Sequence, residues 1–272
     1  MGTRVGVGDG LRVYAALTAA NVRSHMQYRG SFALLTAFDF LIIVADLAPV
    51  YLMVRYFGTL EGWSFAELGL LYGMVGLSWG IVETALRGFA DFGAYLVQGD
   101  LDRWLLRPRS ILLQVAAHQF EARKLGRILQ AGLVLVLAVF FLELPVSSLP
   151  WVLLGVAGGL LFFAGIVLLG AASQFWTLGQ TSELQNMLTY GGSAALIYPV
   201  SIYSRWFRRV LTYGVPLAFV NYFPALAVLG RTEAAGWPAW LPALSPLVCA
   251  AVLLLGAAAF SRGLRRYEST GT

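Results

Sequence analysis

The chain is poor in the side chains on which most enzyme chemistry depends, because its 272 residues include one cysteine, two histidines and a single lysine. Cys249, His25 and His118 provide neither a metal site nor a Cys/His nucleophile at a sensible spacing. A P-loop requires GxxxxGK followed by serine or threonine, whereas Lys124 follows Ala-Arg and precedes Leu125. The sequence therefore predicts a chain without a catalytic, metal or nucleotide site of its own.

Charge is also scarce. Charged residues make up 12% and hydrophobic residues 58% of the chain, whereas a soluble domain has roughly 25% charged residues. The apolar residues gather into runs close to the roughly 20 residues that cross a bilayer as a helix. Lipid favours helices because every backbone polar group must be satisfied internally. The composition thus predicts an all-α polytopic membrane protein formed by a single transmembrane domain over residues 1–272.

We expect six transmembrane helices. The apolar segments are 32–57, 65–86, 128–142, 151–178, a broken pair over 187–229, and 241–260. The third segment is short, so its helix should start earlier than residue 128. Both halves of the broken pair cannot cross if the two chain ends lie on the same side, because the number of crossings must then be even.

The arginines predict the orientation. Residues 87–127 carry seven basic side chains and the tail carries three more, and short loops rich in basic residues stay in the cytoplasm. We therefore expect a multi-pass protein of the bacterial cytoplasmic membrane with both termini inside. Within the cytoplasmic, amphipathic residues 1–30, the segment 11–28 either forms a helix along the inner membrane surface or is a partly disordered leader.

Residues 204–240 predict a re-entrant hairpin and loop on the outer face. Gly214, Pro216 and Pro224 interrupt an apolar stretch, and such breaks occur where the backbone is buried in protein or lines a cavity. This topology places three arginines outside, against the usual bias. Either these arginines bind lipid phosphates or substrate, or the hairpin enters from the inside. They are Arg205, Arg208 and Arg209.

Two acidic residues lie inside the first apolar segment, where ionised groups are costly. Asp39 and Asp46 are seven residues apart and therefore share one helix face. They either line a path for a cationic substrate or pair with polar groups on a neighbouring span. Residues around the hairpin are further candidates for a substrate path, with core packing as the alternative. These are Tyr203, Tyr213, Pro216, Tyr222 and Phe223.

The spans contain two further features, acidic residues near their ends and a series of glycines. Glu83 and Glu143 lie near the ends of expected spans and are interpreted as interfacial residues. The segment 151–178 contains a series of glycines, which permit close approach of helices and predict a packing seam. They are Gly155, Gly158, Gly159, Gly165 and Gly170.

Three segments carry a family resemblance. They are GDLDRWLLRPRSILLQ at 99–114, ELQNMLTYG at 183–191 and YPVSIYSRWFRRVLTYGVPLAFVNYFPALAVLGR at 198–231. Together with the order of the expected elements, these segments resemble the ABC-2 type permeases of bacterial ABC exporters over nearly the whole chain. The resemblance implies a membrane subunit that works with two copies of a separate ATPase, which bind ATP and magnesium, and with a second permease that is identical or homologous.

The resemblance also implies a cytoplasmic coupling helix, which falls on residues 90–106. Here the residues agree, because Leu96, Val97, Leu101 and Leu105 form one apolar stripe and Pro108 disfavours helix at Arg107. The alternative is an amphipathic surface helix without a partner. The residues expected to contact the ATPase are Gly99, Asp100, Leu101, Asp102, Arg103, Leu105, Arg107 and Pro108.

The favoured function is that of the permease of an ATP-driven exporter, with a hydrophobic or amphipathic cargo such as a drug, a lipid or a lipid-linked molecule. A secondary transporter that uses Asp39 and Asp46 for ion coupling is the second hypothesis, although no repeat of broken spans supports it. A membrane scaffold or assembly protein is the third. The net charge of +5 reflects orientation and contact with anionic membrane lipids, so no nucleic-acid partner is expected.

Overall fold

The computed structural model describes residues 58–119, 124–177 and 186–267, and before them residues 30, 34, 37, 38, 40, 41, 48, 49 and 51–56. These residues form helices and connecting turns, and no β-strand occurs among them. The expected surface helix at 11–28 lies outside the described residues, as do Asp39 and Asp46.

The first long helix, α3 (Phe65–Ala85), begins with a reciprocal cap. The Ser64 hydroxyl accepts a bond from the Glu67 amide at 3.4 Å, and the Ser64 amide donates to Glu67 Oε2 at 2.7 Å. Two backbone donors that a helix start leaves without partners are thereby satisfied. The other Glu67 oxygen accepts Arg231 at 2.7 Å, which ties this end of α3 to the loop after α12.

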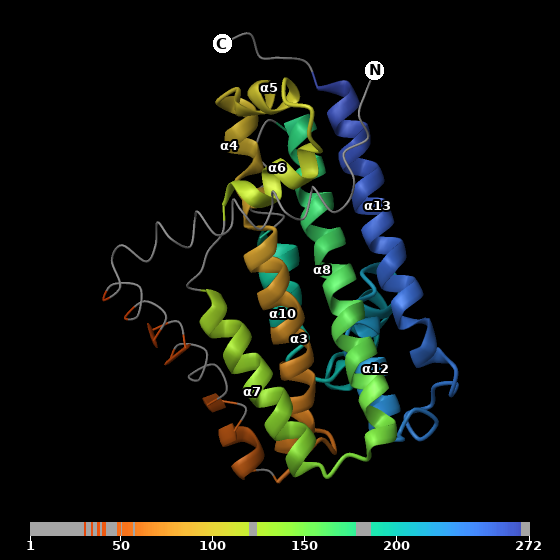
Figure 1. Cartoon of the computed structure of the whole chain (residues 1–272). Coiled ribbons are helices and arrows are strands. Elements are labelled where there is room, and N and C mark those ends of the chain that lie inside the picture. The colour runs from red at the N-terminus through yellow and green to blue at the C-terminus, as the bar shows by residue number, and fades with distance from the viewer. Residues whose placement is uncertain are drawn as a thin grey trace.

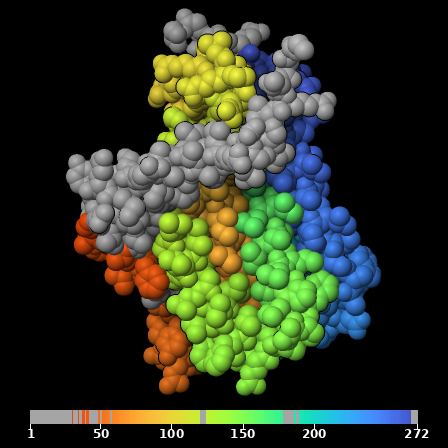
Figure 2. All heavy atoms as spheres, viewed as in Figure 1, coloured from red at the N-terminus to blue at the C-terminus, as the bar shows by residue number. Residues whose placement is uncertain are grey.

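Three further apolar helices pack beside α3. They are α7 (Leu125–Phe141), α8 (Leu149–Thr177) and α13 (Ser245–Arg266), with short 3₁₀ turns at Val146–Ser148 (η4) and Leu241–Leu244 (η9) before the last two. Helix α8 runs alongside α13, and α7 lies against α3 (Figure 1). From the same side, α7 and α8 leave only part of α3 visible (Figure 2). As expected, α7 is short and starts before residue 128.

Three described segments are long and apolar enough to cross a membrane: Phe65–Ala85, Val146–Thr177 and Leu241–Arg266. A fourth is added if the pair Arg205–Gly214 and Leu217–Val228, which is bent by 72°, counts as one span. The helix α7 is shorter, and most of segment 32–57 lies outside the described residues. The structure thus supports a multi-pass helical protein with three to four candidate spans.

Residues 187–228 are more broken than a pair of helices. They form a π-helical turn at Met187–Gly191 (η5), α10 (Gly192–Ala195), a 3₁₀ turn at Val200–Ile202 (η6), α11 (Arg205–Arg209), a second π-helical turn at Val210–Gly214 (η7), a 3₁₀ turn at Leu217–Phe219 (η8) and α12 (Tyr222–Val228). The 72° bend lies between Gly214 and Leu217, at Pro216. Proline lacks the amide proton that a continuous helix requires, which explains the break.

Residues 87–118 form a separate cap at the end of the bundle where α8 and α13 terminate (Figure 1). The cap consists of a 3₁₀ turn at Arg87–Phe89 (η2), α4 (Phe92–Val97), α5 (Asp100–Leu105) and α6 (Ile111–His118). The continuous helix expected at 90–106 is wrong, because Gly99 adopts a left-handed conformation with φ +73° and separates α4 from α5. A residue in that conformation ends a right-handed helix.

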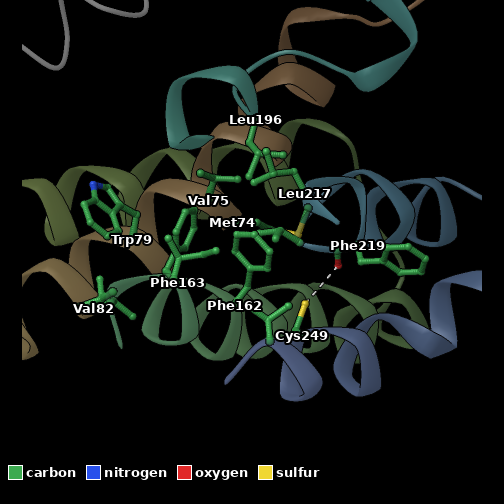
Figure 3. Packing of buried hydrophobic residues seen from close by; sticks show 14 of the residues in the cluster. Met74, Val75, Trp79, Val82, Phe162, Phe163, Leu196, Leu217, Phe219 and Cys249 are labelled. Carbon is green, nitrogen blue, oxygen red and sulfur yellow. Dashed lines mark hydrogen bonds between the residues drawn. The ribbon is translucent and has the colours of Figure 1, made fainter. Parts of the chain in front are cut away.

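The core lies where α3, α8, α13 and the hairpin meet. Figure 3 shows Met74 and Trp79 of α3 facing Phe162 and Phe163 of α8, with Cys249 of α13 beneath. The predicted glycine seam on α8 is confirmed, and it serves more than one neighbour. Gly155 contacts Met74 of α3 and Pro224 of α12, Gly158 contacts Cys249, and Gly165 lies against the backbone of α13.

Candidate functional site

The outer helix of the cap is anchored on one side and exposed on the other. Leu101 is 0% exposed and Trp104 is buried beneath α5. On the opposite side Leu105 is exposed, and Leu106, directly after the helix, is 86% exposed. Val97 at the end of α4 is also exposed. The expected apolar stripe is therefore divided, because one part holds the cap together and the other faces outward.

Charged residues surround these exposed apolar side chains. Arg103 is 75% exposed and pairs with Asp100 at 3.2 Å, one helical turn away. Arg107 and Pro108 form the exposed turn after α5, in which the Arg107 amide donates to the Trp104 carbonyl at 3.1 Å. Arg109 is exposed in the same turn.

Asp102 faces the end of α13. Burial, and after it the neighbouring Asp102 carboxylate, raise the pKa of the Tyr267 phenol, which directly follows α13. Because Tyr267 also packs its ring against Phe175 with centroids 6.2 Å apart, the exposed part of the cap is joined to the ends of both α8 and α13.

Aromatic rings hold the cap together from within. Tyr95 of α4, Trp104 of α5 and His118 of α6 lie edge to face, with ring centroids 5.0 to 5.1 Å apart. Burial, with a smaller contribution from Asp91, raises the pKa of Tyr95 to about 12. The three short helices thus share one aromatic centre, which makes the cap a unit although none of its helices is longer than 8 residues.

A phenylalanine cluster fastens the cap to the bundle. Phe92 lies 5.1 Å from Phe175 of α8 and 5.2 Å from Phe260 of α13, centroid to centroid, and Phe89 lies 5.6 Å from Phe260. In addition, Gly88 packs so closely against the Val115 carbonyl of α6 that a side chain at that position would collide with it. The cap therefore cannot shift without acting on α8 and α13.

Below the cap, one buried carboxylate joins three elements. Glu83, near the end of α3, has a side chain 3% exposed. It accepts Lys124 Nζ at 3.1 Å, Arg127 Nη1 at 2.8 Å and the Tyr190 hydroxyl at 2.7 Å. We call these four residues the Glu83 cluster. The sequence indicates an interfacial position for Glu83, but its side chain is buried. Glu143, for which the sequence indicates the same position, is exposed in the turn after α7.

A cavity of about 190 Å³ adjoins the Glu83 cluster, and we call it the α3–α10 cavity. Arg127 and Tyr190 belong to its wall, and Trp79 adds a large aromatic face. Its complete lining is Tyr72, Val75, Gly76, Trp79, Arg127, Tyr190, Ser193, Ala194 and Ile197. Sequence reasoning did not find it, because its walls come from residues more than 100 positions apart that are mostly apolar.

The candidate substrate-path residues of the hairpin do not gather around this cavity. Tyr222 and Phe223 are buried, and Phe223 packs on Trp237 at 5.1 Å between ring centroids, as the packing alternative predicts. The half-buried Tyr203 donates to the Ala195 carbonyl at 2.9 Å, and Tyr213 is exposed. Pro216 lies at the bend.

Asn221 is a structural residue that sequence reasoning missed. Its side-chain amide is buried and donates to the Leu196 carbonyl at 2.7 Å and the Leu71 carbonyl at 3.5 Å. It thereby satisfies backbone at the end of α10 and holds the hairpin against α3. The sequence signal that could have indicated it is a single side-chain amide within the apolar hairpin, close to the prolines that interrupt the helix.

Comparison with known proteins agrees with this architecture. The family model described as ABC-2 family transporter protein matches residues 40–271. Searches of curated proteins and of solved structures each returned no match. The family match covers the cap, the Glu83 cluster and the hairpin, and hence every element described above. The chain belongs to the ABC-2 transporter family and is an ABC-2 type permease, a membrane-spanning transport subunit.

Proposed function

We propose that this permease works in an ATP-driven exporter, in which two copies of a separate ATPase bind ATP and magnesium and bind the permease through the exposed side of the cap. Family membership implies an ABC ATPase partner. The proposal adds the docking surface, the direction of transport and a hydrophobic or amphipathic cargo. It also places the protein in the bacterial cytoplasmic membrane with both termini in the cytoplasm.

One observation carries the proposal: the cap presents exposed apolar side chains on an anchored base. Val97, Leu105 and Leu106 project outward, while Leu101 and Trp104 beneath them are buried. Exposed apolar side chains ringed by charge are typical of protein–protein contact surfaces. We infer that the apolar residues enter a groove of the ATPase and that the surrounding arginines pair with acidic groups at its rim. These arginines are Arg103, Arg107 and Arg109.

The route of transmission is the phenylalanine cluster. A displacement of α5 acts through Leu101 and Trp104 on the interior of the cap, and from there through Phe92 on the ends of α8 and α13. Packed interiors resist compression, so a push at the cap moves these helices instead of being absorbed. The π-helical turns and the bent hairpin supply irregular backbone that can rearrange as the helices move.

We further propose that the working assembly contains a second permease, identical or homologous. The helix α7 presents one apolar face to the outside of the bundle, and that face suits membrane lipid or a second permease equally well. The exposed residues are Leu129, Leu133, Val136, Leu137, Phe140 and Phe141.

The test is purification of the full chain from its native membrane in lipid, followed by assays for a bound ATP-hydrolysing protein and for ATP-dependent efflux. Reversal of charge in Arg103→Glu and introduction of charge in Leu105→Asp should abolish attachment of the ATPase. Arg209→Glu, an exposed reversal on α11, serves as the matched control. Retention of the ATPase by both cap variants would contradict the docking surface, and a chain that transports without ATP would contradict the exporter assignment.

A further inference from the structure

We infer that the α3–α10 cavity binds the negatively charged head group of an amphiphile, a phosphate or a carboxylate. The inference narrows the proposed cargo to an anionic amphiphile. It rests on the proposed function only if this ligand is the molecule that the exporter transports. The inference uses the charge around the cavity, the free donors of Arg127 in its wall, and its apolar lining.

The first step is the balance of charge. In the Glu83 cluster one carboxylate serves two cations, since Lys124 and Arg127 both pair with Glu83 and with no other carboxylate among the described residues. The Lys124 and Arg127 side chains are only 17% and 25% exposed. Within the described part of the chain, a surplus positive charge therefore lies in a poorly solvated place, where an anion is strongly favoured.

The second step is the geometry of Arg127. Its Nη1 binds Glu83, while its side chain also lines the cavity. A guanidinium group has five N–H donors in a planar fork, and one carboxylate oxygen uses only part of them. The remaining donors are available to a phosphate or carboxylate in the cavity without loss of the bond to Glu83.

The third step is the aromatic part of the wall. Trp79 lines the cavity and is 5% exposed. Its indole nitrogen is covered by protein, so Trp79 contributes apolar ring surface to the cavity and no hydrogen-bond donor. The polar groups available to a head group therefore come from Arg127, and the ring lies beside them.

The fourth step identifies the ligand as an amphiphile. The rest of the wall is aromatic and aliphatic, with Tyr72, Val75 and Ile197 among its residues. The cavity lies between apolar helices along the middle of α3, from Tyr72 to Trp79, and Arg127 near the start of α7 is its basic wall residue. A basic group between spans is a typical binding site for a lipid head group. A free soluble anion would leave the apolar walls unused, whereas an acyl or prenyl chain would cover them.

The inference is tested on the full-length chain in neutral detergent by native mass spectrometry, titrated with phosphatidylglycerol and, separately, with phosphatidylcholine of the same chains. Phosphatidylglycerol should bind at least tenfold more tightly. Arg127→Gln should remove most of this preference, a loss of about tenfold for one charge-assisted contact, whereas Arg127→Lys should retain it. Arg109→Gln, an exposed arginine in the cap, is the matched control and should change nothing.

A second variant guards against misfolding. Ala194→Phe fills the cavity from an exposed wall position without altering charge. It should weaken phosphatidylglycerol binding at an unchanged melting temperature. Equal affinity for the two lipids, or unchanged affinity in both Arg127→Gln and Ala194→Phe, would overturn the inference. Displacement by glycerol phosphate at equal concentration would show that the ligand is a soluble anion and overturn its amphiphilic part. Since no ATPase is present in this assay, its result is independent of the docking test.

Discussion

Glu83 shows how one residue can determine the contact between distant parts of a membrane protein. Its carboxylate pairs with Lys124 and Arg127 at the start of α7, and it accepts a hydrogen bond from the Tyr190 hydroxyl in η5. An isolated charge at this depth would be costly, and the three donors make it tolerable. The same three donors hold the start of α7 and the π-helical turn at fixed positions against α3.

We predict that Glu83→Gln lowers the free energy of unfolding by about 3 kcal/mol, because two poorly solvated cations lose their shared carboxylate. The melting temperature of the purified chain measures the effect. Glu233→Gln, an exposed residue in the loop after α12, should leave the melting temperature unchanged. Addition of Lys124→Gln to the Glu83 variant should recover part of the loss, and a Glu83 variant as stable as the parent chain would refute the assignment.

At the scale of elements, the contacts of α8 with its neighbours depend on glycine. A Cβ at Gly165 would lie 2.7 Å from backbone atoms of Val252 and Leu253, and Gly256 packs against the Gly165 carbonyl in return. Backbone atoms cannot rotate away as a side chain can, so the two helix axes are held at a distance that only glycine permits.

Gly165→Ala should therefore destabilise the chain by about 1 to 3 kcal/mol through overpacking. Gly132→Ala on α7, where an added Cβ meets nothing within 4 Å, is the matched control. It should be neutral or slightly stabilising, since alanine is the better helix former. Thermal unfolding of the two variants in the same detergent compares them directly, and equal melting temperatures would argue against a tight α8–α13 contact.

The phenylalanine cluster makes a separate prediction about transmission. Phe92→Leu removes the ring contacts with Phe175 and Phe260 while the exposed side of the cap stays intact. We expect the ATPase to remain bound and to hydrolyse ATP, while ATP-dependent efflux falls severalfold because movement of α5 no longer reaches α8 and α13. Phe65→Leu, an exposed phenylalanine at the end of α3 away from the cap, should leave efflux unaltered. Parallel loss of binding and efflux in Phe92→Leu would place this residue in docking instead.

For the whole molecule, the fold places the cap and the loop after α12 at different ends of the helical bundle (Figure 1). The cap and the end of α13 lie at one end of the bundle, and the loop after α12 lies at the opposite end (Figure 1). Arg205 is the first residue of the bent hairpin.

Cysteine labelling with a membrane-impermeant reagent in intact cells tests this arrangement. Cys249 is the only native cysteine and is buried, so the background should be low. We expect cysteines at Glu233 and Arg205 to be labelled from outside, and a cysteine at Arg103 to be labelled only after permeabilisation. Labelling of Arg205 only after permeabilisation would mean that the hairpin enters from the inside.

Local signals in the sequence determined much of this protein. Low charge and long apolar runs predicted a helical membrane protein, the motif at 99–114 identified the cap, and the glycines of α8 predicted its packing seam. These signals succeed because lipid imposes the same requirement on every span: apolar side chains outside and backbone bonds within the helix.

Only the tertiary structure decided how these elements act on one another. The break at Gly99 divides the expected coupling helix, and the pairing of Glu83 with Lys124, Arg127 and Tyr190 creates the wall of a cavity. Neither follows from periodicity. A glycine is compatible with a helix until packing selects its left-handed conformation, and the environment of a carboxylate depends on partners 41 to 107 residues away that only the folded chain brings within hydrogen-bonding distance.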